Sequence, residues 1–217
     1  MLIAKKTTAS DLENPSASSW QSANSERLVL APTPIGLQPN PYIQTRWEGK
    51  PYGETGSVDV NALTDGKTIF IRLSWRDATE DCEPHGTQAF PDAAALAFPV
   101  NDDAPLITMG SADAPVNAWL WRADMETENA RNVIATGLGT SFTTAASTVR
   151  CKGVWKEGRW SVTFSRALGV PEAAGGGAQF SPGESIKFGV AVWDGSNGER
   201  AGVKAFSQEW KTLKVEG

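Results

Sequence analysis

Residues 67–77, KTIFIRLSWRD, carry the clearest indication of the fold class of this chain. Ile69, Ile71, Leu73 and Trp75 fall at every second position, so their side chains share one face of an extended segment. Such alternation, built from β-branched and aromatic residues, is typical of a strand that is buried on one face. The segment therefore predicts a β-strand that packs on a core.

Other segments along the chain have the same composition, and few windows show the helical spacing of apolar residues. Within VWKEGRWSVTF, Glu157 and Gly158 predict the tight turn of a hairpin. We expect an all-β fold, an antiparallel β-sandwich with few short helices. The further predicted strands are 26–32, 93–100, 116–124, 148–158, 159–168, 184–195 and 203–215.

The length of 217 residues suits one large domain. Residues 1–24 are polar and predict an extended N-terminal arm, which leaves 25–217 for the sandwich. Segments 77–92, acidic with two prolines, and 169–183, rich in glycine and alanine, predict long loops. Loops of this length in a compact domain are often functional, so we expect the arm or a loop to contact a partner protein.

The net charge of −5, without a basic block, argues against nucleic acid or an anionic membrane surface as partner. No apolar run approaches the roughly 18–20 residues of a membrane span. The start of the chain, MLIAKKTTASDLENPSASSW, does not resemble a signal peptide. Three interpretations stay open: a signal absent from this sequence, a cytoplasmic protein, or export together with a partner.

Cysteine and histidine are scarce. Cys82 and Cys151 do not lie in a CxxC or CxxCH motif, which excludes covalent c-type haem attachment and a zinc ribbon. The two thiols could form a disulfide or stay separate. His85, the single histidine, lies in a proline-rich loop, so bis-histidine metal sites and a Ser/His/Asp triad lack their residues.

Nine tryptophans are unusual in a chain of this length, and three interpretations compete for them. They could pack the core, stack on sugar rings as a carbohydrate platform, or form the wall of a flat apolar cofactor pocket. Met109 and Lys204 are also open to ordinary explanations. A methionine in an apolar run commonly fills gaps in a core, and a lysine at a strand start commonly faces solvent.

Two blocks of sequence change this balance. Residues 97–124, AFPVNDDAPLITMGSADAPVNAWLWRAD, and residues 188–210, FGVAVWDGSNGERAGVKAFSQEW, resemble the haem b-binding gamma subunits of the ethylbenzene dehydrogenase group. These are periplasmic molybdenum enzymes that include dimethylsulfide dehydrogenase, selenate reductase and chlorate reductase. The resemblance covers roughly residues 25–215, with loops 77–92 and 169–183 departing from the pattern.

The resemblance implies one non-covalent haem b, held between the sheets of a β-sandwich. Met109 of the TMG motif and Lys204 after the N-x-E-R-x-G loop match the family's axial iron ligands. Gly110 would let the backbone pass close to the macrocycle, and the candidates for binding the propionates are Arg122, Asn117, Arg200 and Ser207. A lysine binds iron only when deprotonated, so its pKa must fall below the roughly 10.4 of free lysine, as burial would cause.

The resemblance further implies a non-catalytic electron-transfer subunit of a heterotrimeric enzyme. It would relay electrons between an iron–sulfur beta subunit and an external partner of the cytochrome c type. The molybdopterin alpha subunit would carry the substrate chemistry, and the complex would be exported together to the periplasm. The alternative is a carbohydrate- or other ligand-binding sandwich without a redox role, since one fold hosts many functions.

Overall fold

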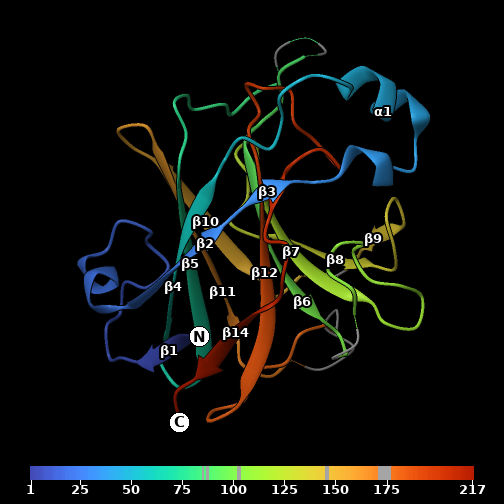
Figure 1. Cartoon of the computed structure of the whole chain (residues 1–217). Helices are drawn as coiled ribbons and strands as arrows, with labels where there is room; N and C mark the ends of the chain where they lie inside the picture. Colours follow the sequence, from blue (N-terminus) through green and yellow to red (C-terminus); the bar gives the residue numbers. More distant parts are fainter. Residues whose placement is uncertain (85, 87, 102–103, 145–146, 171–176) are drawn as a thin grey trace.

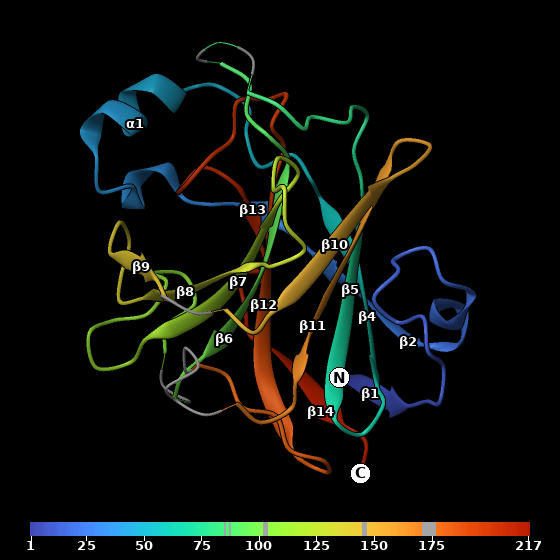
Figure 2. The ribbon, with the colours of Figure 1, turned by 180° about the vertical axis from the view of Figure 1, so that it is seen from behind.

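The computed structural model describes residues 1–84, 86, 88–101, 104–144, 147–170 and 177–217. Strands dominate it, arranged as two layers that lie face to face (Figures 1 and 2). This confirms the predicted all-β sandwich with few helices. The helical segments are η1 (Ser18–Ser22), η2 (Ile35–Leu37) and α1 (Pro41–Trp47).

The first layer runs in the order β10-β11-β5-β4, with β2 paired to β4, and the second in the order β12-β6-β7-β8-β9. All of these pairs are antiparallel. The first-layer strands are β10 (Arg150–Trp155), β11 (Arg159–Ala167), β5 (Thr68–Arg76), β4 (Ser57–Thr64) and β2 (Asn24–Val29). The second-layer strands are β12 (Ser185–Trp193), β6 (Ala93–Pro99), β7 (Val116–Arg122), β8 (Arg131–Ala135) and β9 (Ser141–Thr143).

Two terminal strands join the layers. β1 (Leu2–Lys6) pairs in parallel with β4 and with β14 (Lys211–Val215). β14 in turn pairs in antiparallel orientation with β12. Both views accordingly place the two chain ends close together (Figures 1 and 2). The extended arm expected for residues 1–24 is therefore corrected, because β1 lies inside the sheet and Trp20, 1% exposed, packs on Leu63 and Phe70.

The main core fills the space between the layers. Ile69, Ile71, Leu73 and Trp75, predicted on one face of a strand, are each at most 1% exposed in it. Trp75 meets Trp121 of the opposite layer with ring centroids 6.3 Å apart. Five of the nine tryptophans are buried, which confirms core packing as their role: Trp20, Trp75, Trp119, Trp121 and Trp160.

Turn chemistry accounts for the predicted hairpin. Glu157 and Gly158 have φ of 52° and 73°, the left-handed values that a two-residue type I′ turn requires. Lys156 and Arg159 close it by exchanging backbone hydrogen bonds of 2.9 and 3.1 Å. The strand predicted at 203–215 is split into β13 (Ala205–Phe206) and β14, which pair with different parts of β12, and β13 also pairs with β3 (Ala31–Pro32).

The structure leaves Cys82 and Cys151 as free thiols. Among the described residues, no helix is both long and apolar enough to cross a membrane. Part of the predicted loop 169–183, residues 171–176, lies outside the described residues, and so does His85. In the described part of that loop, Ala178 and Phe180 are buried in the main core.

Candidate functional site

Met109 lies in the loop between β6 and β7, and its backbone is fixed by three hydrogen bonds. Its N–H donates to Leu106 O at 3.0 Å, its carbonyl accepts from Gly137 N at 3.2 Å, and Gly110 N donates to Pro105 O at 2.8 Å. Met109 has φ of 57°, which few residues other than glycine adopt. The thioether packs on a small apolar cluster formed by Ala97, Ala104, Leu106, Ala114 and Val116.

Gly110 is required by the packing of the chain itself. It has φ of 83°, and a Cβ atom there would lie 2.7 Å from Ala114 O and 3.0 Å from both Ala135 O and Val116 N. The predicted reason for this glycine was room for a macrocycle. The structure supplies a different reason, a close approach of backbone to backbone that sets the position of Met109.

Lys204 precedes β13, and segment 33–38 clamps its backbone. Thr33 N donates to Lys204 O at 3.0 Å, and the Thr33 hydroxyl donates to Gly202 O at 2.6 Å. Gln38, only 4% exposed, donates its amide to the same Gly202 carbonyl at 2.9 Å. The loop that carries Lys204 is therefore fixed by side chains distant in sequence.

The amine of Lys204 is buried and poorly partnered. The residue is 6% exposed, and its Nζ donates to Ala201 O at the long distance of 3.4 Å. The Trp193 ring centroid lies 5.3 Å from Nζ. An ammonium group offers three donors, and burial without full compensation disfavours the charged form. Burial accordingly lowers the pKa of Lys204 to about 8.

Met109 and Lys204 line the same small cavity, of about 10 Å³. Its other walls come from segment 33–38, from Leu106 and Ile107, and from Leu138 and Phe206. The two residues come from distant parts of the chain, and the sequence alone could not show that they meet. A soft thioether and an amine that can deprotonate are both iron ligands, so the donor set fits a haem iron.

Both residues lie on the outer face of the second layer. On β6 and β7, Leu96, Phe98, Trp119 and Trp121 point into the main core, so their neighbours point outward. The cluster beneath Met109 includes the outward-facing Ala97 and Val116. Because side chains fill the space between the layers, the structure places both predicted ligands outside that space. The cavity that both residues line is therefore on the outer side of this layer and not between the sheets, where the resemblance places the haem.

Small residues dominate that outer face. Strand pairing aligns Gly189 with Ala97 and Ala118, and Ala191 with Ala95 and Leu120. Trp193, Ala93 and Arg122 form the next row. The repeated alanines of AAALA, residues 93–97, are the sequence signal for this small-residue surface, although the composition of the segment predicts only a strand there.

The structure does not bring Asn117 to this site. Its side chain points into the core, where Oδ1 accepts from Trp119 Nε1 at 3.1 Å and from Ala178 N at 3.2 Å. Its amide donates to Asn132 Oδ1 at 2.6 Å and to Val133 O at 3.1 Å. Asn117, fully buried, therefore uses its hydrogen-bonding groups within the protein. Ser207 is likewise occupied, accepting from Val190 N at 2.9 Å.

Arg200 lines a second cavity, of about 430 Å³, beside Lys204. Trp193 and Ala201 belong to this cavity and also contact the Lys204 amine. The guanidinium of Arg200 lies 4.4 Å from the Phe90 ring centroid. Two further arginines line the cavity, Arg122, which was a candidate in the sequence, and Arg131, which sequence reasoning missed.

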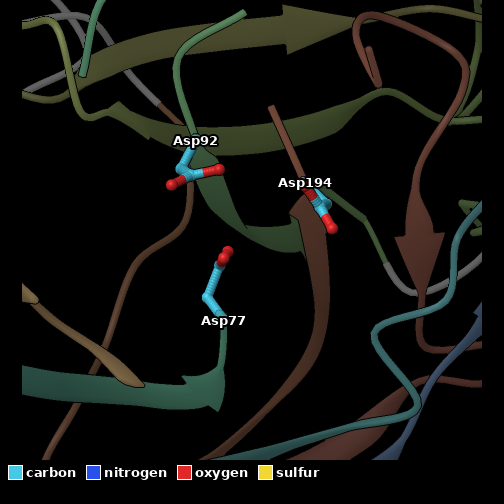
Figure 3. Close-up of side chains that lie close together, drawn as sticks. All are labelled: Asp77, Asp92 and Asp194. Carbon is cyan, nitrogen blue, oxygen red and sulfur yellow. The ribbon is translucent and has the colours of Figure 1, made fainter. Parts of the chain in front are cut away.

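Three aspartates meet at the ends of three strands: Asp77 after β5, Asp92 before β6 and Asp194 after β12 (Figure 3). Carboxylate oxygens of the three lie within 4.8 Å of one another, and Asp77 points toward Asp92. Asp92 accepts from Trp160 Nε1 and Gly195 N, each at 2.8 Å, which ties the strand ends together. Burial, and then the Asp92 charge, raise the pKa of Asp77 to about 7, and burial raises that of Asp92 to about 6.

The ethylbenzene dehydrogenase family model matches residues 17–141 and 137–205, which include Met109 and Lys204. The chain belongs to the ethylbenzene dehydrogenase family. This confirms the family that the two sequence blocks indicated.

Three proteins similar to this chain have names that describe their subunits. A protein of Haloferax mediterranei, named as a respiratory nitrate reductase haem subunit, is 35% identical over 202 residues, covering 91% of this chain and 66% of the relative. The chlorate reductase gamma subunit of Ideonella dechloratans is 37% identical over 161 residues, covering 74% and 65%. The dimethylsulfide dehydrogenase gamma subunit of Rhodovulum sulfidophilum is 30% identical over 192 residues, covering 84% and 67%. The chain spans about two thirds of the length of these relatives.

Solved structures confirm the sandwich at the level of fold. A family 9 carbohydrate-binding module from Caldicellulosiruptor kristjanssonii, in complex with glucose, matches with a TM-score of 0.51. The match covers 100% of this chain and 95% of the module, at 9% identity. At that identity the similarity concerns the fold alone.

Proposed function

We propose that the chain is an electron-transfer subunit that binds one non-covalent haem b. The observation that supports this most directly is that Met109 and Lys204, at the positions of the family's axial ligands, line one cavity. When bound, the haem supplies a one-electron redox centre whose potential depends on its axial ligands and their burial.

The residues of this chain would hold the group and shield it. Lys204 is held ready to deprotonate, because its buried amine has a pKa of about 8. The thioether of Met109 is a soft, neutral donor placed on an apolar cluster. Met109 and Lys204 would together occupy the iron positions that oxygen or substrate could otherwise take, which would suit an electron carrier and not a catalytic centre.

The names of the relatives support the choice of partners. Two of them are named as gamma subunits and one as the haem subunit of a reductase. We infer that this chain assembles with an iron–sulfur beta subunit and a molybdopterin alpha subunit. It would pass electrons between the iron–sulfur subunit and a soluble cytochrome c. The complex would lie in the periplasm, where this subunit would arrive with its partners.

The axial pair can be tested by optical and EPR spectroscopy of the purified, haem-loaded protein. Wild type should be red, with a low-spin spectrum and a Soret band that shifts on dithionite reduction. Met109→Ala should give high-spin character and a lower reduction potential, because the ferrous state loses its soft donor. Lys204→Ala should lose the low-spin spectrum and regain it with added imidazole.

Matched controls are Met125→Ala and Lys67→Ala, which remove the same side chains away from the cavity. Both should keep the wild-type spectrum. A His85→Ala variant that lost the low-spin signal, with Lys204→Ala unchanged, would show that the ligand assignment is wrong. A protein that stays colourless with added hemin but is retarded on polysaccharide gels would favour the alternative, a carbohydrate-binding module.

A further inference from the structure

We propose that the cavity beside Lys204 binds the two carboxylate groups of the haem, with Arg131 and Arg200 as their partners. This inference rests on the proposed haem function and assigns the polar end of the site. Haem is a flat apolar ring with two anionic propionates at one edge. Its pocket therefore needs apolar walls that continue into a cationic end.

The cavity lies on the same face as the predicted ligands. Trp193 and Ala201, which contact the Lys204 amine, also line this cavity. Strand pairing places Trp193, Ala93 and Arg122 in one row, and the adjacent Leu120 pairs with Arg131. This row and Arg131 therefore form one wall of the cavity, next to the Lys204 amine.

The lining combines apolar walls with cationic groups. Phe90, Pro91, Ala93, Leu120 and Trp193 supply the apolar surface. The cationic groups are the guanidinium groups of Arg122, Arg131 and Arg200, and a guanidinium binds a carboxylate through two parallel hydrogen bonds. Apolar walls with a few converging charged groups are typical of a cofactor pocket.

The three arginines are not equally available. Arg122 already forms an ion pair with Asp124, with 2.7 Å between Nη2 and Oδ2. Arg131 is exposed and forms no ion pair within the described part of the chain. Arg200 is also exposed, and it lies against the Phe90 ring and not against a carboxylate. Arg131 and Arg200 are therefore the two cations that can accept a new anionic partner.

One acidic residue lines the cavity, and its charge is already engaged. Glu199 is 1% exposed. Its Oε1 accepts from Gly53 N at 2.6 Å and from Asn197 Nδ2 at 3.1 Å, and its Oε2 accepts from Asp194 N at 3.1 Å. These donors turn the carboxylate into the loop, so the exposed groups of the cavity remain cationic.

The test compares haem with haem dimethyl ester, in which both carboxylates are esterified and uncharged. Apoprotein is titrated with each compound and binding is followed by the Soret band. Wild type should bind haem at least about tenfold more tightly than the ester, as expected when charged hydrogen bonds are made. The double variant Arg131→Ala/Arg200→Ala should bind haem about tenfold more weakly and the ester unchanged, so that the two affinities converge.

The double variant Arg131→Lys/Arg200→Lys should bind haem with an affinity between those of wild type and the double alanine variant. The positive charge stays in this variant while the paired hydrogen bonds are lost. The control Arg76→Ala removes an exposed arginine at the end of β5 and should leave both affinities unchanged. Since the substituted side chains are exposed, far-UV circular dichroism should match wild type. A double variant that keeps the wild-type preference for haem overturns this inference while leaving the proposed function intact. Wild type that binds neither compound overturns both.

Discussion

The Nζ atom of Lys204 lies 5.3 Å from the ring centroid of Trp193, over the face of the indole. The aromatic face offers this cation weak stabilisation in place of water, and the Ala201 carbonyl adds one long hydrogen bond of 3.4 Å. A buried amine with so few partners lowers the stability of the protein that holds it. Residues that a ligand requires commonly carry such a cost.

Lys204→Met should therefore stabilise the apoprotein. The pKa of Lys204 is about 8 in the folded protein and roughly 10.4 in the unfolded chain. Burying the charged amine therefore lowers the free energy of unfolding at pH 7, and this loss shrinks as pH rises from about 8 to about 10.4. We expect the free energy of unfolding in urea to rise by about 1–3 kcal/mol at pH 7, and by less at pH 10. Lys67→Met is the control, and equal gains from both variants would contradict this account.

Asp77→Asn should change how stability depends on pH. The pKa of Asp77 is about 7 in the folded protein and roughly 4 when unfolded, so the folded state binds more protons between these values. Stability from this group is then full below about pH 4 and is lost as pH rises toward 7. The amide removes that loss, and we expect the variant to gain about 1–3 kcal/mol over wild type at pH 8 and little at pH 4.5.

Urea unfolding at the two pH values measures this difference. Asp65→Asn, which makes the same chemical change in an exposed turn, is the control. A gain for Asp77→Asn that is equal at both pH values would contradict the raised pKa of the buried Asp77 carboxyl.

Gly110→Ala should destabilise the fold strongly. The new Cβ would meet three backbone atoms at 2.7–3.0 Å and would also hold alanine at φ of 83°. Gly49 provides a matched control, since it has φ of 70° with nothing within 4 Å of an added Cβ. Thermal unfolding should show a loss of about 1 kcal/mol for Gly49→Ala and at least about 2 kcal/mol more for Gly110→Ala. Similar losses would mean that the close approach does not matter.

Thr33→Val should loosen the loop that carries Lys204. The substitution removes the hydroxyl that donates to Gly202 O at 2.6 Å and leaves the shape of the side chain nearly unchanged. We expect a loss of about 1–2 kcal/mol in stability, together with weaker haem binding in a Soret titration. Thr212→Val, on an exposed position of β14, should change neither property. Wild-type haem affinity in Thr33→Val would contradict the role of the clamp.

Local pattern was enough to predict much of this fold. Alternation at Ile69, Ile71, Leu73 and Trp75 identified a strand and its buried face, since side chains of a strand alternate between two sides regardless of partners. The hairpin at Glu157 and Gly158 followed from turn chemistry in the same way. Strand β1 was missed because five residues within a polar segment carry too little pattern, and pairing with β4 and β14 determines its conformation.

The family and the candidate ligands could also be predicted from the sequence, because Met109 and Lys204 lie within recognisable blocks. The folded structure was needed to show that the two line one cavity on the outer side of the second layer. It also turned Asn117 into the core, brought Thr33 to the Lys204 loop and placed Arg131 beside Arg200. Each of these depends on which strands pair and in what register, and a one-residue shift in register would move every side chain to the opposite face.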